Sequence, residues 1–160
     1  MALKNLLHPT SPSFRETGLG IVRIFLGVFM IYHGWEVFDR TKMDEYTKWM
    51  VDMKLFAPSF MAHLGKAIEL VTGIFIVLGL FTRIAMIPLG ITMLFICFAI
   101  GKGRIFMEEQ YPFLFFLLCF LFFFTGPGKW SMDKLLFRDS KIKFDKPQPL
   151  KFSSPADRLK

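Results

Sequence analysis

Cysteines are few in this 160-residue chain, and residues with the spacing of metal ligands are missing. It has only two cysteines, Cys97 and Cys119, which stand in separate apolar runs with no Cys-x-x-Cys pair. No set of Cys and His residues has the spacing of a zinc, haem or iron–sulfur site, and there is no glycine-rich nucleotide motif. The sequence therefore predicts no metal and no cofactor of its own. Any redox role would depend on a bound quinone or on a partner that carries the cofactor.

The sequence also lacks the mixing of charged and apolar residues that is typical of a soluble domain. Hydrophobic residues make up 53% of the chain and Phe occurs 21 times. They gather in runs close to the 20 or so residues that cross a bilayer. Spanning segments must satisfy their own backbone groups, so we expect helices at about 18–38, 59–81, 83–100 and 107–125. The predicted fold is all-α, an integral membrane four-helix bundle whose main partner is the lipid bilayer.

Positive charge is distributed unevenly along the chain, whose net charge is +7. Nine Lys and Arg residues lie between Lys129 and Lys160, directly after the last apolar run, and this placement indicates an orientation signal and not a nucleic-acid site. The side with both termini and the 82–83 hairpin has twelve Lys and Arg residues, and the other side has six. We therefore expect both termini in the cytoplasm. The predicted parts are a segment at 1–17, the helical domain at 18–137 and a basic cytoplasmic tail at 138–160.

Two further apolar features of the sequence predict specific roles. The polar connection 39–58 contains Trp49, Met50, Met53 and Phe56, which predict a short amphipathic helix lying on the membrane. The fourth apolar run has seven Phe residues between Tyr111 and Thr125. They either face lipid and fill the core, or line a slot for a quinone ring or a lipid tail.

Ionisable residues inside the predicted spans are candidate functional sites, because each costs roughly 2.5–3.5 kcal/mol on insertion. Helical periodicity places Arg23 and Glu69 on the small-residue packing faces of the first and second spans. Lys66 is one turn before Glu69, so the two can pair. We predict a polar cluster of His33, Lys66 and Glu69 with Arg23 on its inner edge, and expect Glu36 to reach the interface. The cluster either binds a ligand or only fixes helix packing.

Several short motifs follow one another in a definite order between about Gly18 and Phe137. The first span has Arg23, Gly27 and the pair His33-Gly34. Gly65-Lys66-Ala67-Ile68-Glu69 comes next, and the last motif is Gly126-Pro127-Gly128-Lys129-Trp130-Ser131-Met132-Asp133. In order and spacing these motifs resemble the DoxX family. The resemblance implies a four-helix protein of the bacterial inner membrane, in a family that includes the small subunit of a thiosulfate:quinone oxidoreductase. The family often has a Lys shortly after the His-Gly pair, and this chain departs from that pattern with Val37.

Three functions fit these observations. The chain could be a membrane subunit of a quinone-linked oxidoreductase, with a second subunit as partner and with Glu69, His33 and Arg23 beside the quinone. It could be a non-catalytic anchor or assembly subunit, alone or as a homo-oligomer. It could also be a small lipid-binding or transport bundle. No catalytic motif decides whether the chain is an enzyme.

Overall fold

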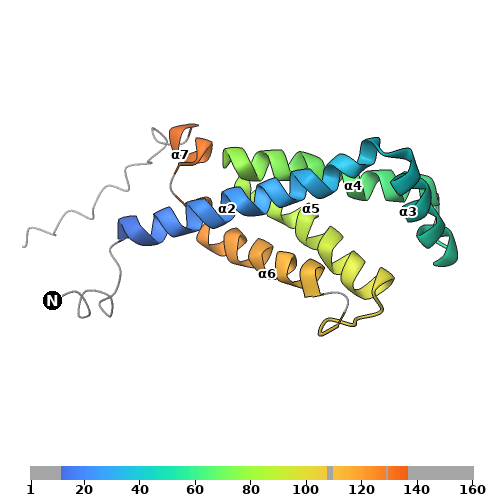
Figure 1. Cartoon of the computed structure of the whole chain (residues 1–160). Helices are drawn as coiled ribbons and strands as arrows, with labels where there is room; N and C mark the ends of the chain where they lie inside the picture. The colour runs from blue at the N-terminus through green and yellow to red at the C-terminus, as the bar shows by residue number, and fades with distance from the viewer. Residues whose placement is uncertain (1–11, 108–109, 129, 137–160) are drawn as a thin grey trace, which may run out of the picture.

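The structure is a computed structural model, which describes residues 12–107, 110–128 and 130–136, with side chains from Arg15 onward. Every regular element in these ranges is a helix, so the all-α prediction is confirmed. Figure 1 shows α2 (Pro12–Gly34) and α4 (Pro58–Leu78) running alongside each other, with α5 (Thr82–Phe95) and α6 (Gln110–Thr125) below them. Most of the predicted segment 1–17 and the tail 138–160 lie outside the described residues.

Three helical stretches are long and apolar enough to cross a membrane. They are Arg15–Phe38, Pro58–Leu78 and Thr82–Ile100, and they confirm a multi-pass membrane protein. The first joins α2 to a short 3-10 turn, η1 (Trp35–Phe38), and the third joins α5 to a π-helical turn, η2 (Ile96–Ile100). The apolar α6 is shorter, at 16 residues or about 24 Å, against a hydrocarbon thickness of about 30 Å.

Two helix starts differ from the predicted ones, and proline explains both. The first helix begins at Pro12 and not at Gly18, since proline suits a first turn in which an N–H has no partner within the helix. Met107 was expected to begin the fourth helix, but it lies in a turn, where its N–H bonds to the carbonyl of Arg104. Pro112 falls in the first turn of α6, and a start near Met107 would have placed it in the helix interior.

The α2–α4 contact is the closest in the bundle, as the glycine pattern predicts. A Cβ on Gly27 would lie 2.8 Å from the carbonyl oxygen of Gly73, and one on Gly34 would overlap the backbone of Leu70. The two backbones therefore touch, and this contact needs residues without side chains. Gly65 belongs to the same small-residue face of α4 by its helical spacing, yet nothing lies within 4 Å of its Cβ position.

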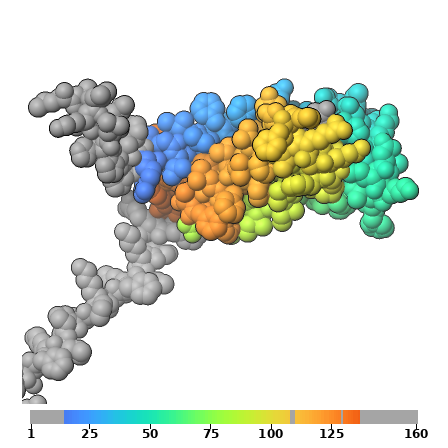
Figure 2. Space-filling model, turned by 90° about the horizontal axis from the view of Figure 1, so that it is seen from below, coloured from blue at the N-terminus to red at the C-terminus, as the bar shows by residue number. Residues whose placement is uncertain are grey.

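The connection between α2 and α4 contains α3 (Arg40–Asp52), which begins with Asp39 accepting bonds from the N–H groups of Thr41 and Lys42. The predicted helix is present, but its apolar face is not simply laid on lipid. Met43 and Met50 are buried against Ala62 of α4, because they lie on one face of α3. Figure 2 shows α3 at one end of the molecule, beyond the α5–α6 connection. We call this the α3 end.

The opposite end holds the α4–α5 turn and α7 (Met132–Leu136), and we call it the α7 end (Figure 1). Phe81 has a left-handed φ of 47° in this turn. Asp133 stabilises it by accepting hydrogen bonds from the N–H groups of Phe81 (2.7 Å) and Thr82 (3.1 Å). The Asp133 N–H in turn donates to the carbonyl of Gly79. The segment after α6 thus closes the α7 end.

Candidate functional site

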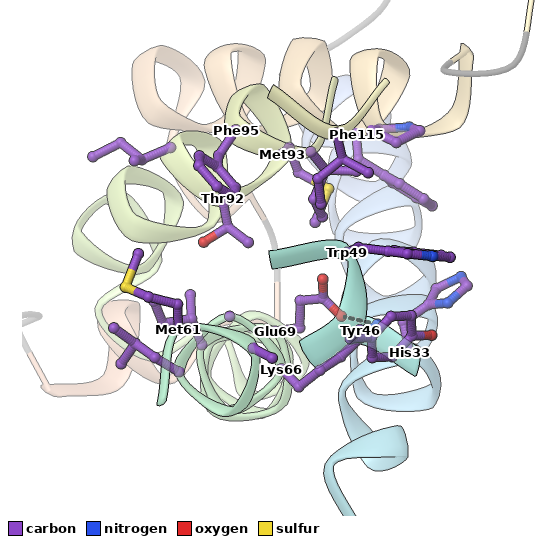
Figure 3. Close-up of a pocket in the computed structure, with 18 of the residues that line it drawn as sticks. His33, Tyr46, Trp49, Met61, Lys66, Glu69, Thr92, Met93, Phe95 and Phe115 are labelled. Carbon is purple, nitrogen blue, oxygen red and sulfur yellow. Dashed lines mark hydrogen bonds and ion pairs between the residues drawn. The ribbon is translucent and has the colours of Figure 1, made fainter. Parts of the chain in front are cut away.

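A cavity of about 460 Å³ lies near the α3 end, between α2, α3, α4, α5 and α6. Its volume falls within the range of about 300–1,000 Å³ that is usual for small-molecule pockets. Figure 3 shows Thr92, Met93 and Phe95 of α5 with Phe115 of α6 along one wall. Met61, Lys66 and Glu69 of α4 lie across the cavity from them. Most lining side chains are apolar, and the ionisable ones are His33, Tyr46, Lys66, Glu69 and Tyr111.

Lys66 is the centre of the polar end of the cavity. Its Nζ lies 3.0 Å from Glu69 Oε2 and 3.0 Å from Glu36 Oε2, so one ammonium bridges two carboxylates. It also lies 4.7 Å from the centre of the Tyr46 ring, which is the geometry of a cation–π contact. The predicted pairing of Lys66 with Glu69 is present, at the i, i+3 spacing of one helical turn.

Glu69 is the most buried member of this group. Its side chain is 3% exposed, and its carboxylate points into the cavity in Figure 3. His33 lines the same cavity from α2 and meets the Phe115 ring edge-on, with 6.5 Å between ring centres. The structure therefore brings three of the four predicted site residues to one cavity: His33, Lys66 and Glu69.

Arg23 does not belong to this cluster, and the expectation that it lies on the cluster's inner edge is wrong. It is fully buried, and its guanidinium donates to the carbonyls of Pro127 (2.7 Å), Trp130 (3.0 Å) and Val77 (3.5 Å). Its partners are backbone groups of the closing segment and of α4, at the α7 end. Arg23 thus ties three parts of the chain together.

Two residues of the polar group, Glu36 and Tyr46, were not predicted for it. Glu36 lies in η1 and accepts a 2.6 Å hydrogen bond from the Tyr46 hydroxyl. Burial, followed by the hydrogen bond to Glu36, raises the pKa of Tyr46, so its hydroxyl keeps its proton and remains a donor. A signal was available in α3: Met43, Tyr46 and Met50 follow i, i+3, i+7 spacing, and this face packs inward.

The described residues show no other obvious chemistry. They contain no group of three or more His, Cys, Asp or Glu side chains that could hold a metal ion. Both cysteines are buried, in separate helical elements. The cavity with its Lys66-centred cluster is therefore the candidate site.

Comparison with known proteins agrees with this architecture. Residues 18–102, more than half of the chain, match the DoxX family. The chain belongs to the DoxX family. The matched DoxX region contains α3, α4, α5 and every ionisable residue of the cavity except Tyr111.

Two curated relatives resemble this DoxX chain over most of their length. One, from Bacillus subtilis strain 168, is named "Putative oxidoreductase CatD" and is 27% identical over 79% of this chain and 92% of the relative. Another, from Haemophilus influenzae, is named "Uncharacterized protein" and is 29% identical over 78% of this chain and 95% of the relative. No solved structure matches the chain.

Proposed function

We propose that this DoxX chain is the quinone-binding membrane subunit of an oxidoreductase. The observation that carries the proposal is the cavity, which joins a largely apolar space of about 460 Å³ to a single ionisable cluster. A quinone has this chemistry, because its ring and tail are apolar and its two carbonyl oxygens accept hydrogen bonds. Met and Phe side chains would contact the ring, and the Lys66 ammonium would donate to one carbonyl oxygen.

The electrons would come from a second subunit with its own redox cofactor. The name of the Bacillus subtilis relative supports an oxidoreductase role. The thiosulfate:quinone type is the form of this role that the family resemblance suggests. The second subunit would meet the bundle at a membrane surface.

The proposed setting is the bacterial inner membrane, crossed by all four helices of the 18–137 domain. Both termini and the 138–160 tail would lie in the cytoplasm. The positive-inside rule supports this orientation, since the α7 end and the termini carry twelve Lys and Arg residues against six at the α3 end. The cavity would then lie toward the outer face.

Glycine 65 offers a direct test of quinone binding. Because nothing lies within 4 Å of its Cβ position, Gly65→Leu would fill the cavity without a backbone clash. The assay is tryptophan fluorescence of the full chain in lipid vesicles, titrated with short-tailed ubiquinone and menaquinone analogues. Trp49 lines the cavity, so a bound quinone quenches it. We expect saturable quenching, with affinity at least about tenfold weaker in Gly65→Leu, or about 1.4 kcal/mol.

Gly18→Leu is the matched control. Gly18 also has open space at its Cβ position, but it is exposed near the start of α2 and does not line the cavity. It should bind quinone as the wild type does. Quenching that rises without saturation, and equally in all three proteins, would mean that quinone only dissolves in the lipid. That result would overturn the proposal.

A further inference from the structure

The polar group at the α3 end forms a continuous chain from the surface to the cavity. Glu36, Lys66 and Glu69 follow one another at 3.0 Å per step. Their side chains are 23%, 14% and 3% exposed, in the same order. Exposure thus falls from the outermost carboxylate to the innermost, which points into the cavity (Figure 3).

A packing role alone does not explain why Lys66 lies between two carboxylates. One carboxylate would be enough to neutralise Lys66, yet two lie within 3.0 Å of it. With both ionised, the trio carries one excess negative charge in a largely buried place, which is costly unless a proton is shared. The other ionisable groups near the trio or the cavity, element by element, are His33 of α2, Lys42, Glu45 and Tyr46 of α3, and Tyr111 of α6.

We propose that Glu36, Lys66 and Glu69 conduct protons between the aqueous phase at the α3 end and a ligand in the cavity. This inference rests on the proposed function for the identity of the ligand, a quinone whose reduced form carries protons on its oxygens. Tyr46 holds Glu36 in place through its hydroxyl and does not itself conduct. Exchange would occur at the α3 end alone.

The transfer moves protons only, and each of the three side chains ends in the protonation state in which it began. A proton from water binds the Glu36 carboxylate. The Lys66 ammonium then gives one N–H proton to Glu69 and receives the proton of Glu36, so Lys66 is again an ammonium. The Glu69 carboxyl passes its proton to the ligand oxygen and returns to a carboxylate. One proton has then crossed from solvent to the ligand, and the same steps run in reverse when a quinol is oxidised.

Infrared spectroscopy of the full chain in phospholipid vesicles tests this pathway. The protonated carboxyl band is recorded over a pH series, and its exchange is then timed after transfer to deuterated buffer. We expect a titrating band that is lost in Glu69→Gln. Exchange of that band should slow by roughly tenfold or more in Glu36→Gln and in Lys66→Met, because each breaks the path to water. Glu16→Gln is the control, since Glu16 pairs with Lys134 at the α7 end.

Each outcome decides the proposal. A band that never appears, or that survives in Glu69→Gln, would overturn it. Exchange as fast in Glu36→Gln and Lys66→Met as in the wild type would also overturn it. Quinone quenching of Trp49 is measured on the same vesicles and reports separately on the proposed function. Slowed exchange without saturable quenching would keep the proton pathway and refute quinone as the ligand.

Discussion

Replacing Arg23 by Leu should loosen the α7 end of the bundle. The change keeps a shorter apolar side chain and removes every donor. Arg23 is fully buried and connects α2 to the carbonyls of Pro127, Trp130 and Val77. Without it, the closing segment loses the two hydrogen bonds that join its Pro127 and Trp130 carbonyls to α2.

Two sets of hydrogen-bond energies give upper and lower limits for the free energy of unfolding that Arg23→Leu loses. A hydrogen bond to a charged group contributes about 1.5–3 kcal/mol in soluble proteins, which gives about 3–6 kcal/mol for the two shorter bonds. Side-chain bonds measured inside a membrane protein average about 0.6 kcal/mol, with a maximum near 1.7, which gives about 1–3 kcal/mol. The carbonyls of Pro127 and Trp130 lie outside helices, so no bond within a helix replaces the lost donor, and we expect an intermediate value of about 2–4 kcal/mol.

The assay is reversible denaturant unfolding in mild detergent, followed by tryptophan fluorescence. Arg83→Leu is the matched control, because Arg83 is exposed and makes one long 3.5 Å contact with the carbonyl of Phe124. Its free energy of unfolding should stay within about 0.5 kcal/mol of that of the wild type. Arg23→Lys keeps the charge but cannot reach all three carbonyls, so its free energy of unfolding should lie between those of the wild type and Arg23→Leu. Equal free energies of unfolding for Arg23→Leu and Arg83→Leu would refute the reasoning.

Two further predictions concern orientation and charge balance. A cysteine placed at Lys48 should react with a membrane-impermeant maleimide on intact cells, whereas one placed at Lys151 should not, because the Lys and Arg asymmetry places α3 outside; equal labelling would contradict this orientation. Lys66→Leu should destabilise the protein more than Glu69→Leu, because the first leaves two carboxylates without their cation, while the second leaves Lys66 paired with Glu36. Unfolding free energies check this order, and the reverse order would mean that the two carboxylates do not share Lys66.

Much of the fold could be predicted from apolar runs and glycine spacing. The three membrane-length helices and the close α2–α4 contact at Gly27 and Gly73 follow from these patterns. These patterns do not predict where α6 begins or which partner the apolar face of α3 contacts. A single proline in the first turn moves the start of α6 to Gln110, and the buried face of α3 depends on Met43 and Met50 meeting α4. The second contact is tertiary, so periodicity alone cannot choose between lipid and protein for that face.

The candidate site was predictable only in part, for a similar reason. Lys66 and Glu69 lie one turn apart on one helix, so local geometry predicts their pairing. The two nearest acceptors of Arg23 are backbone carbonyls more than a hundred residues away in a non-helical segment, and depth matching between helices cannot find them. Glu36 joins the cluster because the 3-10 turn η1 ends α2 and α3 folds back to bring Tyr46 to it.

The two cations Arg23 and Lys66 therefore differ in what they can do. The guanidinium of Arg23 donates to fixed backbone carbonyls, and its surroundings at the α7 end are closed by the 126–133 segment. In the described part of the chain, Lys66 is paired with carboxylate side chains, which can exchange protons and change rotamer, and it lies beside open space. A ligand can compete for the contacts of Lys66 without unfolding the backbone, but it cannot compete for those of Arg23. Chemistry in this protein is thus expected at the α3 end, and the motif at the α7 end is expected to hold the bundle in which that chemistry occurs.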